Sequence, residues 1–222
     1  MRRFANVAVA VALKDLRAEW RSRELIWALA QFGILALLIA NFGFDINHAN
    51  AGEIAPGILW LTIVFAGLVG FGRAFGAERE QASLEAMLLT AAPAAAIFAG
   101  KAIASALFLV ACEFVVVLGL GLFFSIPVAS WALVGAILLA TVGMAAVGCL
   151  FSGLAAQTRA RDLLLPVLTL PVWIPLVVAG GRAVQVAMGA PGSSSGAVGL
   201  LLDFDILLVV ATSLAARFVL DE

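Results

Sequence analysis

The feature that most constrains this chain is a run from Phe114 to Thr158 that contains no charged residue. A helix needs roughly 20 apolar residues to cross the hydrocarbon core of a bilayer. The run is therefore long enough for two crossings, separated by a turn at Phe124–Ser130. The composition agrees, because 64% of the residues are hydrophobic and only 12% are charged, whereas a soluble domain is about a quarter charged. The chain is predicted to be an integral membrane protein.

The apolar runs predict six membrane-spanning helices in a single transmembrane domain that covers residues 1–222. The last span contains Asp203 and Asp205, which we place toward its starting end. The predicted fold class is an all-α integral membrane protein, with spans at about 25–44, 54–74, 97–124, 131–156, 163–181 and 198–220.

The positive charges indicate the orientation of these spans. With the N-terminus inside, all of the 13 Lys and Arg residues except Arg182 fall on the cytoplasmic side. Lys and Arg in short loops are retained in the cytoplasm. Both termini are therefore predicted to be cytoplasmic. Arg73 and Lys101, close to the ends of their spans, are expected to extend to the cytoplasmic interface.

The N-terminal segment, about residues 3–22, has the pattern of an amphipathic helix. Val9, Leu13, Leu16 and Trp20 share one stripe at helical spacing, and charged residues occupy the rest. Such a helix is expected to lie on the cytoplasmic face of the membrane. A solvated tail with fortuitous spacing is the alternative.

Apparent catalytic motifs are incomplete. Gly100-Lys101 resembles the end of a nucleotide-binding loop, but Ala95 stands where its first glycine belongs and Ala102 where Ser or Thr would hold magnesium. His48 is the only histidine, whereas a catalytic metal site needs about three protein ligands. The chain is therefore predicted to be non-catalytic and to bind no metal or cofactor itself.

Two features stand out inside the predicted spans. Glu113 lies near the middle of the third span, where a charged side chain costs about 2.5–3.5 kcal/mol. A functional role and a structural hydrogen bond to a neighbouring helix both remain open for it. The fifth span carries Pro166, Pro171 and Pro175, and it is expected to be kinked or broken because each proline removes a helical hydrogen bond.

Charge is concentrated in the loop after the second span, in "EREQASLEAMLL" (residues 78–89). Helical spacing places Leu84, Met87 and Leu88 on one face and Glu78, Gln81 and Glu85 on another. This pattern predicts a short amphipathic helix that docks a soluble partner through its charges and its apolar side. A solvated helix without a partner is the alternative.

The order of these motifs closely resembles the CcmB family, the membrane subunits of the haem-exporter-type ABC transporter of cytochrome c maturation. The resemblance covers nearly the whole chain, and it is most specific in "APGILWLTIVFAGLVGFGRAFGAEREQASLEAMLL" and "TRARDLLLPVLTLPVWIPL". It implies a six-helix type II ABC-exporter fold in a bacterial inner membrane. It also implies a homodimer, a CcmA subunit that binds ATP and magnesium, and association with CcmC, CcmD and the haem-loaded chaperone CcmE. ATP hydrolysis in CcmA would drive release of CcmE.

The resemblance also implies roles for individual residues. Glu78, Arg79, Glu80 and Glu85, with Leu84 and Leu88, would form the segment that couples the chain to the ATPase. Arg159, Arg161 and Asp162 match the second cytoplasmic loop, Glu113 matches an acidic position of span three, and Pro166, Pro171 and Pro175 match the proline-rich span. "TAAPAAAIF" departs from the family by its alanine content, and no haem ligand set is visible.

A second class of function remains open. The chain could be a stand-alone secondary transporter that uses Glu113 for proton coupling, or a membrane scaffold. Copurification of an ATP-binding chain would distinguish these alternatives from the ABC permease. Membrane lipid is an expected contact in either case, and no nucleic-acid partner is expected.

Overall fold

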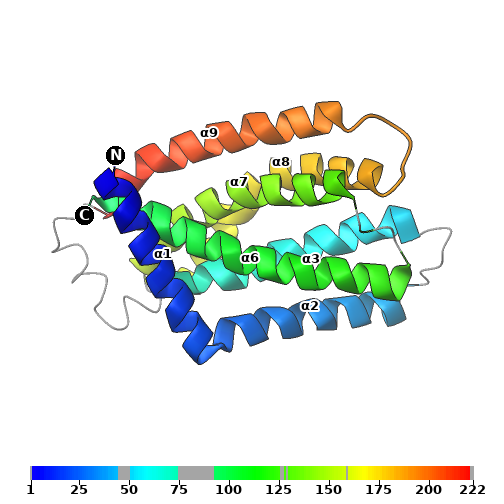
Figure 1. Ribbon diagram of the computed structural model, residues 1–222, viewed down its shortest axis with the longest axis horizontal. Coiled ribbons are helices and arrows are strands. Elements are labelled where there is room, and N and C mark those ends of the chain that lie inside the picture. The colour runs from blue at the N-terminus through cyan, green and yellow to red at the C-terminus, as the bar shows by residue number, and fades with distance from the viewer. Residues whose placement is uncertain are drawn as a thin grey trace.

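The protein is described from a computed structural model (Figure 1). The structure describes residues 2–44, 51–74, 93–125, 128, 130–158 and 160–220. Within these ranges the chain is all-helical and contains no strand. Its seven helices are α1 (Arg2–Ser22), α2 (Glu24–Gly43), α3 (Ala51–Ala74), α6 (Ala94–Phe124), α7 (Trp131–Ala156), α8 (Arg161–Ala187) and α9 (Ser195–Leu220).

Six of these described helices, all except α1, are long and apolar enough to cross a membrane. The prediction of an all-α integral membrane protein with six spans is thus confirmed. Several helices extend past the expected ends: α6 begins at Ala94, α8 continues to Ala187 and α9 begins at Ser195. Large apolar side chains such as Leu122 and Trp131 are exposed on the outside of the bundle, where lipid is the solvent.

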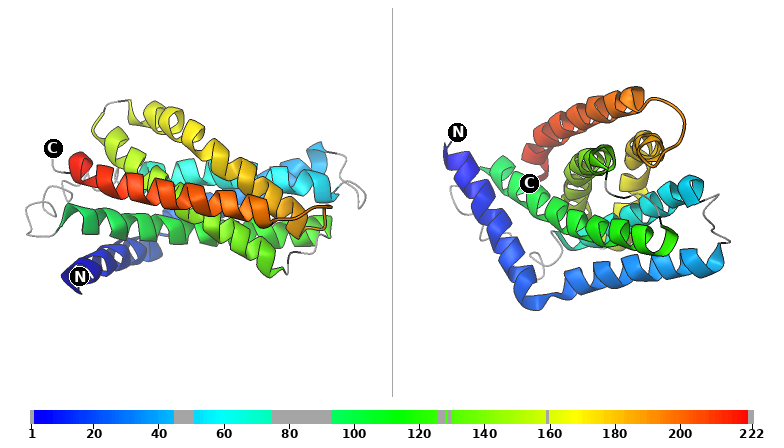
Figure 2. Two further views of the ribbon diagram at one scale, coloured as in Figure 1. Left: turned by 90° about the horizontal axis from the view of Figure 1, so that it is seen from above. Right: turned by 45° about the vertical axis from the view of Figure 1, so that its right-hand side comes forward.

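The spans alternate in direction, and α7 lies at the centre of the bundle (Figures 1 and 2). It packs against α3, α6, α8 and α9. In its most apolar stretch 72% of the residues are buried, against 17% for α9, which lies at the edge. Small residues such as Ala136, Ala140 and Gly143 are buried along α7, and small side chains let neighbouring helices approach closely.

The proline-rich span is one continuous helix, α8, in which Pro166, Pro171 and Pro175 all lie inside helical backbone. The expected break is therefore wrong, whereas a bend at these residues stays a prediction. A proline removes only its own N–H from the hydrogen-bond ladder, and packing against neighbouring helices holds the remainder. Trp173, between two of the prolines, is fully buried and meets Phe71 of α3 edge-on at 5.8 Å between ring centroids.

The helix α1 lies across one end of the bundle, at a steep angle to α2 (Figure 2). Its Ala8, Val11 and Ala12 are buried, and the helix packs against α6. The predicted stripe instead points away from the bundle, with Val9 and Trp20 exposed. This arrangement gives α1 two apolar faces, one for the bundle and one free to contact the membrane surface.

Candidate functional site: the basic end of the bundle

Most of the predicted coupling residues fall outside the part of the chain that the structure describes. Glu78, Arg79, Glu80, Leu84, Glu85 and Leu88 lie in the stretch 75–92, and Arg159 is also outside the described residues. Arg161 begins α8, and Asp162 follows it in the first turn. The described site therefore consists of the helix ends around these positions: α1, the start of α2, the end of α3, the start of α6 and the α7–α8 corner. We call it the basic end.

The helices on either side of the stretch 75–92, α3 and α6, each carry a residue that forms an ion pair with another helix. Arg73, in the last turn of α3, donates a hydrogen bond from Nη2 to Glu24 Oε2 at the start of α2, over 2.7 Å. Lys101, in α6, lies with Nζ 3.3 Å from Asp15 Oδ2 of α1. The first pair is exposed to solvent and contributes little by itself to stability. Together the two pairs connect the helices that flank the stretch to α1 and α2.

Lys101 is one of the largest fully buried side chains among the described residues, with 1% of it exposed. Its ammonium group is not exposed to solvent, because α1 packs over this part of α6 and encloses it. A buried charge needs a partner of opposite charge, and Asp15 provides it from a position 86 residues away in the chain. The pair thus joins α1 to the membrane-spanning bundle.

The corner between α1 and α2 is held by Glu19. Its Oε1 accepts hydrogen bonds from the backbone N–H of Leu25, at 2.6 Å, and of Ile26, at 3.2 Å. These donors belong to the first turn of α2, where helical N–H groups have no partner within the helix and attract negative charge. Arg23 makes the turn itself in a left-handed conformation, with φ of 57°. The direction of α1 relative to α2 is therefore set by specific contacts.

Gly100 allows the close approach of α1 to α6. A Cβ atom at this position would lie 2.5 Å from the carbonyl oxygen of Ala8 and 2.8 Å from Cβ of Val11. Neither atom is the end of a flexible side chain, so any larger residue must push the two helices apart. The Gly100-Lys101 pair, which resembles part of a nucleotide loop, thus serves helix packing and ion pairing.

Replacement of Gly100 by alanine is expected to destabilise the protein by about 1–3 kcal/mol, the usual cost of overpacking. The measurement is thermal unfolding in detergent. Gly70→Ala is the matched control, because a Cβ atom there meets nothing within 4 Å and alanine is the better helix former. Equal melting temperatures for Gly100→Ala and Gly70→Ala would contradict the packing of α1 on α6.

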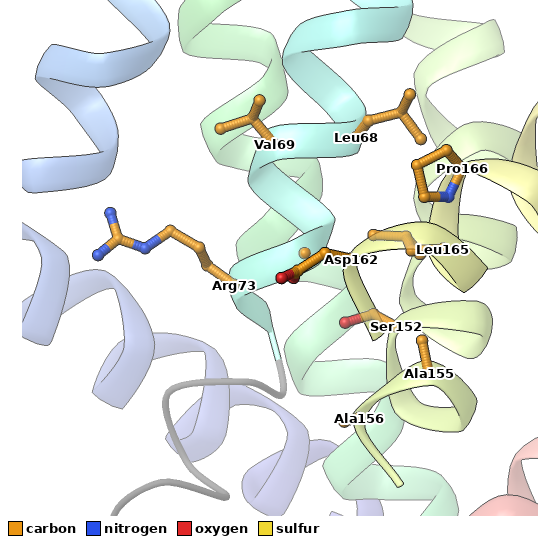
Figure 3. A pocket seen from close by; sticks show the side chains of 10 residues that line it. Leu68, Val69, Arg73, Ser152, Ala155, Ala156, Asp162, Leu165 and Pro166 are labelled. Atoms are coloured by element: carbon orange, nitrogen blue, oxygen red, sulfur yellow. The ribbon is translucent and has the colours of Figure 1, made fainter. Parts of the chain in front are cut away.

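Asp162 lines a pocket of about 260 Å³ between α3, α7 and α8 (Figure 3). Figure 3 shows its carboxylate directed from α8 toward α3, whereas Arg73 is directed away from it. Ser152 of α7 lines the same pocket and donates a hydrogen bond to the carbonyl oxygen of Phe71. The structure thus brings the predicted second-loop residue Asp162 beside the end of α3, from which the stretch 75–92 departs.

Glu113 is buried between α6 and α7, with 3% of it exposed. The hydroxyl of Thr141 donates to its Oε1 over 2.6 Å, and its Oε2 has no hydrogen-bond partner among the described residues. Glu113 lies about 16 Å along the axis from the end of α6 at Phe124, at about 1.5 Å per residue. The prediction that it faces the bundle interior is confirmed. Only one of its two carboxyl oxygens has a hydrogen-bond partner among the described residues.

Asp205, which the sequence placed toward the start of the last span without predicting its burial, is a second buried carboxyl group. It is 5% exposed, and neither of its oxygens has a hydrogen-bond partner among the described residues. It lies against α7, where a Cβ atom on Gly143 would clash with its Oδ1. Its position is about 15 Å along the axis from Ser195, in the first half of α9, as expected. Asp205 lies at helical spacing from Leu201, Thr212 and Ala216, which are all buried. This spacing is the sequence pattern that could have indicated its burial.

The comparison with protein families agrees with this architecture. The model of the family described as "CcmB protein" matches residues 6–221. The chain belongs to the CcmB family. The match includes most of α1, so this helix across the end of the bundle is part of the family's chain. It also spans the stretch 75–92, Arg159 and all six membrane-spanning helices.

Curated relatives of this CcmB-family chain are similar over most of their length. One named "Heme exporter protein B" from Paracoccus denitrificans is 29% identical over 186 residues, which are 83% of this chain and 84% of the relative. Proteins with the same name from Pseudomonas aeruginosa and Bradyrhizobium diazoefficiens are 30% and 28% identical. They cover 86% and 93% of this chain, and 86% and 94% of their own lengths.

The described part of this CcmB-family chain offers no metal centre, since no three His, Cys, Asp or Glu residues in it lie close enough to hold an ion. Cys112 and Cys149 are both buried as free thiols. The distinctive feature of the described site is therefore its ion pairs, which join the helices on either side of the stretch 75–92 to α1 and α2.

Proposed function

We propose that this chain is the permease subunit of a haem-exporter ABC transporter that acts in cytochrome c maturation. The observation that carries the proposal is the family match over residues 6–221, with relatives named as haem exporter proteins over most of both lengths. The chain has the six apolar helices that a permease needs. We place it in a bacterial inner membrane with both termini in the cytoplasm, because the positive charges gather at the basic end.

The energy for transport would come from a partner. The sequence contains no complete nucleotide-binding loop of its own, so ATP and magnesium would be bound by a separate subunit, CcmA. The proposed docking element is the stretch 75–92, with Glu78, Arg79, Glu80 and Glu85 setting the orientation and Leu84 and Leu88 packing against CcmA. Arg159, Arg161 and Asp162 would form the second contact beside it.

An ATPase drives a membrane protein only if its ATP-bound and ATP-free states contact that protein differently. The ion pairs of Arg73 with Glu24 and of Lys101 with Asp15 support a route for this difference. They join both flanks of the docking element to α1 and α2, so a displacement there is passed to whole helices. A bend of α8 at its prolines is the proposed hinge, and the proposed outcome is release of haem-loaded CcmE.

The wider assembly that we propose is a homodimer of this chain with CcmA, CcmC and CcmD, and with haem carried by CcmE. The test is purification of the tagged chain in mild detergent, with and without a non-hydrolysable ATP analogue, followed by mass spectrometry of the bound proteins. An ATP-binding subunit is expected to copurify in both conditions. Isolation of the chain alone, from cells that make cytochromes c, would overturn the proposal.

One observation favours a different candidate, a secondary transporter driven by protons. Glu113 and Asp205 are both buried near mid-membrane depth, and three of their four carboxyl oxygens have no partner among the described residues. Intramembrane carboxyl groups of this kind mark proton pathways in many transporters. If Glu113→Gln abolished cytochrome c maturation in a chain that copurifies no ATPase, this second candidate would replace the first.

A further inference from the structure

A groove between α8 and α9 lies at the end of the bundle opposite the basic end. Its volume is about 670 Å³, within the roughly 300–1,000 Å³ of typical small-molecule sites. Its walls are mostly apolar, with Val178, Leu200 and Phe204 among the lining residues, and Arg182, Gln185 and Ser193 provide the polar groups. The connection between α8 and α9, at the right of Figure 1, contributes Ala190, Pro191, Gly192 and Ser193 to the lining.

Arg182 is the cation of this groove, and nothing in the described part of the chain neutralises it. Its side chain is exposed and makes no hydrogen bond or ion pair with the residues that the structure describes. The nearest acidic residue of α9 in sequence terms, Asp203, is exposed but does not line the groove. The groove therefore combines an apolar interior with a single uncompensated positive charge.

The depth of Arg182 indicates what can reach it. It lies about 32 Å along α8 from Arg161, at about 1.5 Å per residue, and the hydrocarbon core of a bilayer is about 30 Å thick. The guanidinium is therefore level with the headgroups of the leaflet opposite the basic end. The walls below it, such as Val178 and Leu200, are more than half exposed and open sideways toward lipid tails.

We propose that the α8–α9 groove is a binding site for one anionic phospholipid of that leaflet. The phosphate would be held by Arg182, which offers several N–H donors to an anionic oxygen, with Gln185 and Ser193 as further polar neighbours. An acyl chain would lie along Val178, Leu200 and Phe204. Such a lipid fills the space between α8 and α9, the least buried span, and stabilises their spacing.

The experiment is native mass spectrometry of the full-length, delipidated protein, titrated with phosphatidylglycerol in detergent. Arg182→Gln is expected to weaken binding about tenfold or more, the effect of losing a hydrogen bond to a charged group, whereas Arg182→Lys keeps most of the affinity. Arg217→Gln, which removes a positive charge near the opposite end of α9, is the matched control and should bind like the wild type. Ala197→Phe, which places a large side chain in the groove, is expected to abolish binding.

Three results would overturn the proposal. Equal binding by Arg182→Gln and the wild type would show that Arg182 does not hold the phosphate, even if Ala197→Phe still excluded an acyl chain. Competition by millimolar inorganic phosphate would identify a soluble anion as the ligand. Loss of self-association in Arg182→Gln, with lipid binding unchanged, would assign this face to a second copy of the chain. Should Ala197→Phe fail to fold, by circular dichroism, Ala197→Leu takes its place.

Discussion

Replacement of both Glu78 and Glu80 by lysine is expected to abolish copurification of the ATP-binding subunit and the ATPase stimulation that depends on it. These residues belong to the proposed docking element, and like charges brought together at an interface cost several kcal/mol. A double reversal changes the local charge by four units, so association should fall below detection. The measurement is the amount of ATP-binding subunit retained on the tagged chain, together with the rate of ATP hydrolysis in the eluate.

The matched control is the double replacement of Asp221 and Glu222 by lysine, which makes the same change of charge at the C-terminus. This control is expected to retain the subunit, because neither residue belongs to the proposed docking element in the sequence. Both variants should melt at the wild-type temperature, since neither alters a helix contact described here. Retention of the subunit and of its ATPase activity by the Glu78/Glu80 variant would show that docking occurs elsewhere.

Replacement of Asp15 by asparagine is expected to destabilise the protein by about 3 kcal/mol, the lower part of the range for breaking a buried ion pair. Lys101 is almost completely enclosed, whereas 19% of the Asp15 side chain is exposed. Loss of the carboxylate therefore removes the negative charge that lies 3.3 Å from an enclosed ammonium group. Lys101→Met should cost much less, because methionine fills the space and Asp15 keeps Lys14 as a neighbour at 3.4 Å.

The double variant Asp15→Asn/Lys101→Met separates the ion pair from the packing of α1. We expect it to be more stable than Asp15→Asn alone, with an interaction energy of roughly 1–3 kcal/mol in the double-mutant cycle. Thermal or denaturant unfolding in detergent provides the free energies. Additive effects of the two single changes would mean that the pair does not hold α1 on the bundle. The ranking of the three variants is the decisive result, because surface ion pairs show no such asymmetry.

The span architecture could be predicted because the bilayer imposes simple rules on each helix separately. The charge-free run from Phe114 to Thr158 became α6 and α7, and the end of α7 at Ala156 agrees with the expected boundary. The interior position of Glu113 followed from the cost of charge in hydrocarbon. The amphipathic pattern of residues 3–22 indicated α1, although it revealed only the exposed stripe.

The contacts of Lys101, Asp205 and Asp162 depend on the rotation and depth of helices relative to one another. Lys101 lies near the start of an apolar run, and hydropathy alone placed it at the interface. Its actual partner is 86 residues away, on a helix whose second apolar face was not recognised. The sequence placed Asp205 toward the start of its span, but only the packing of α9 against α7 shows that its carboxyl group is buried.

The sequence by itself determined that the chain lies in a membrane, how many spans it has and the family to which it belongs. These properties follow from local composition and from the order of motifs, since each span must be apolar whatever packs beside it. Only the tertiary structure decided which charges are enclosed and paired. The enclosure of Lys101 by α1, and its pairing with Asp15, depend on a contact between distant helices that packing creates. The Gly100-Lys101 sequence is thus explained by the helix that covers it.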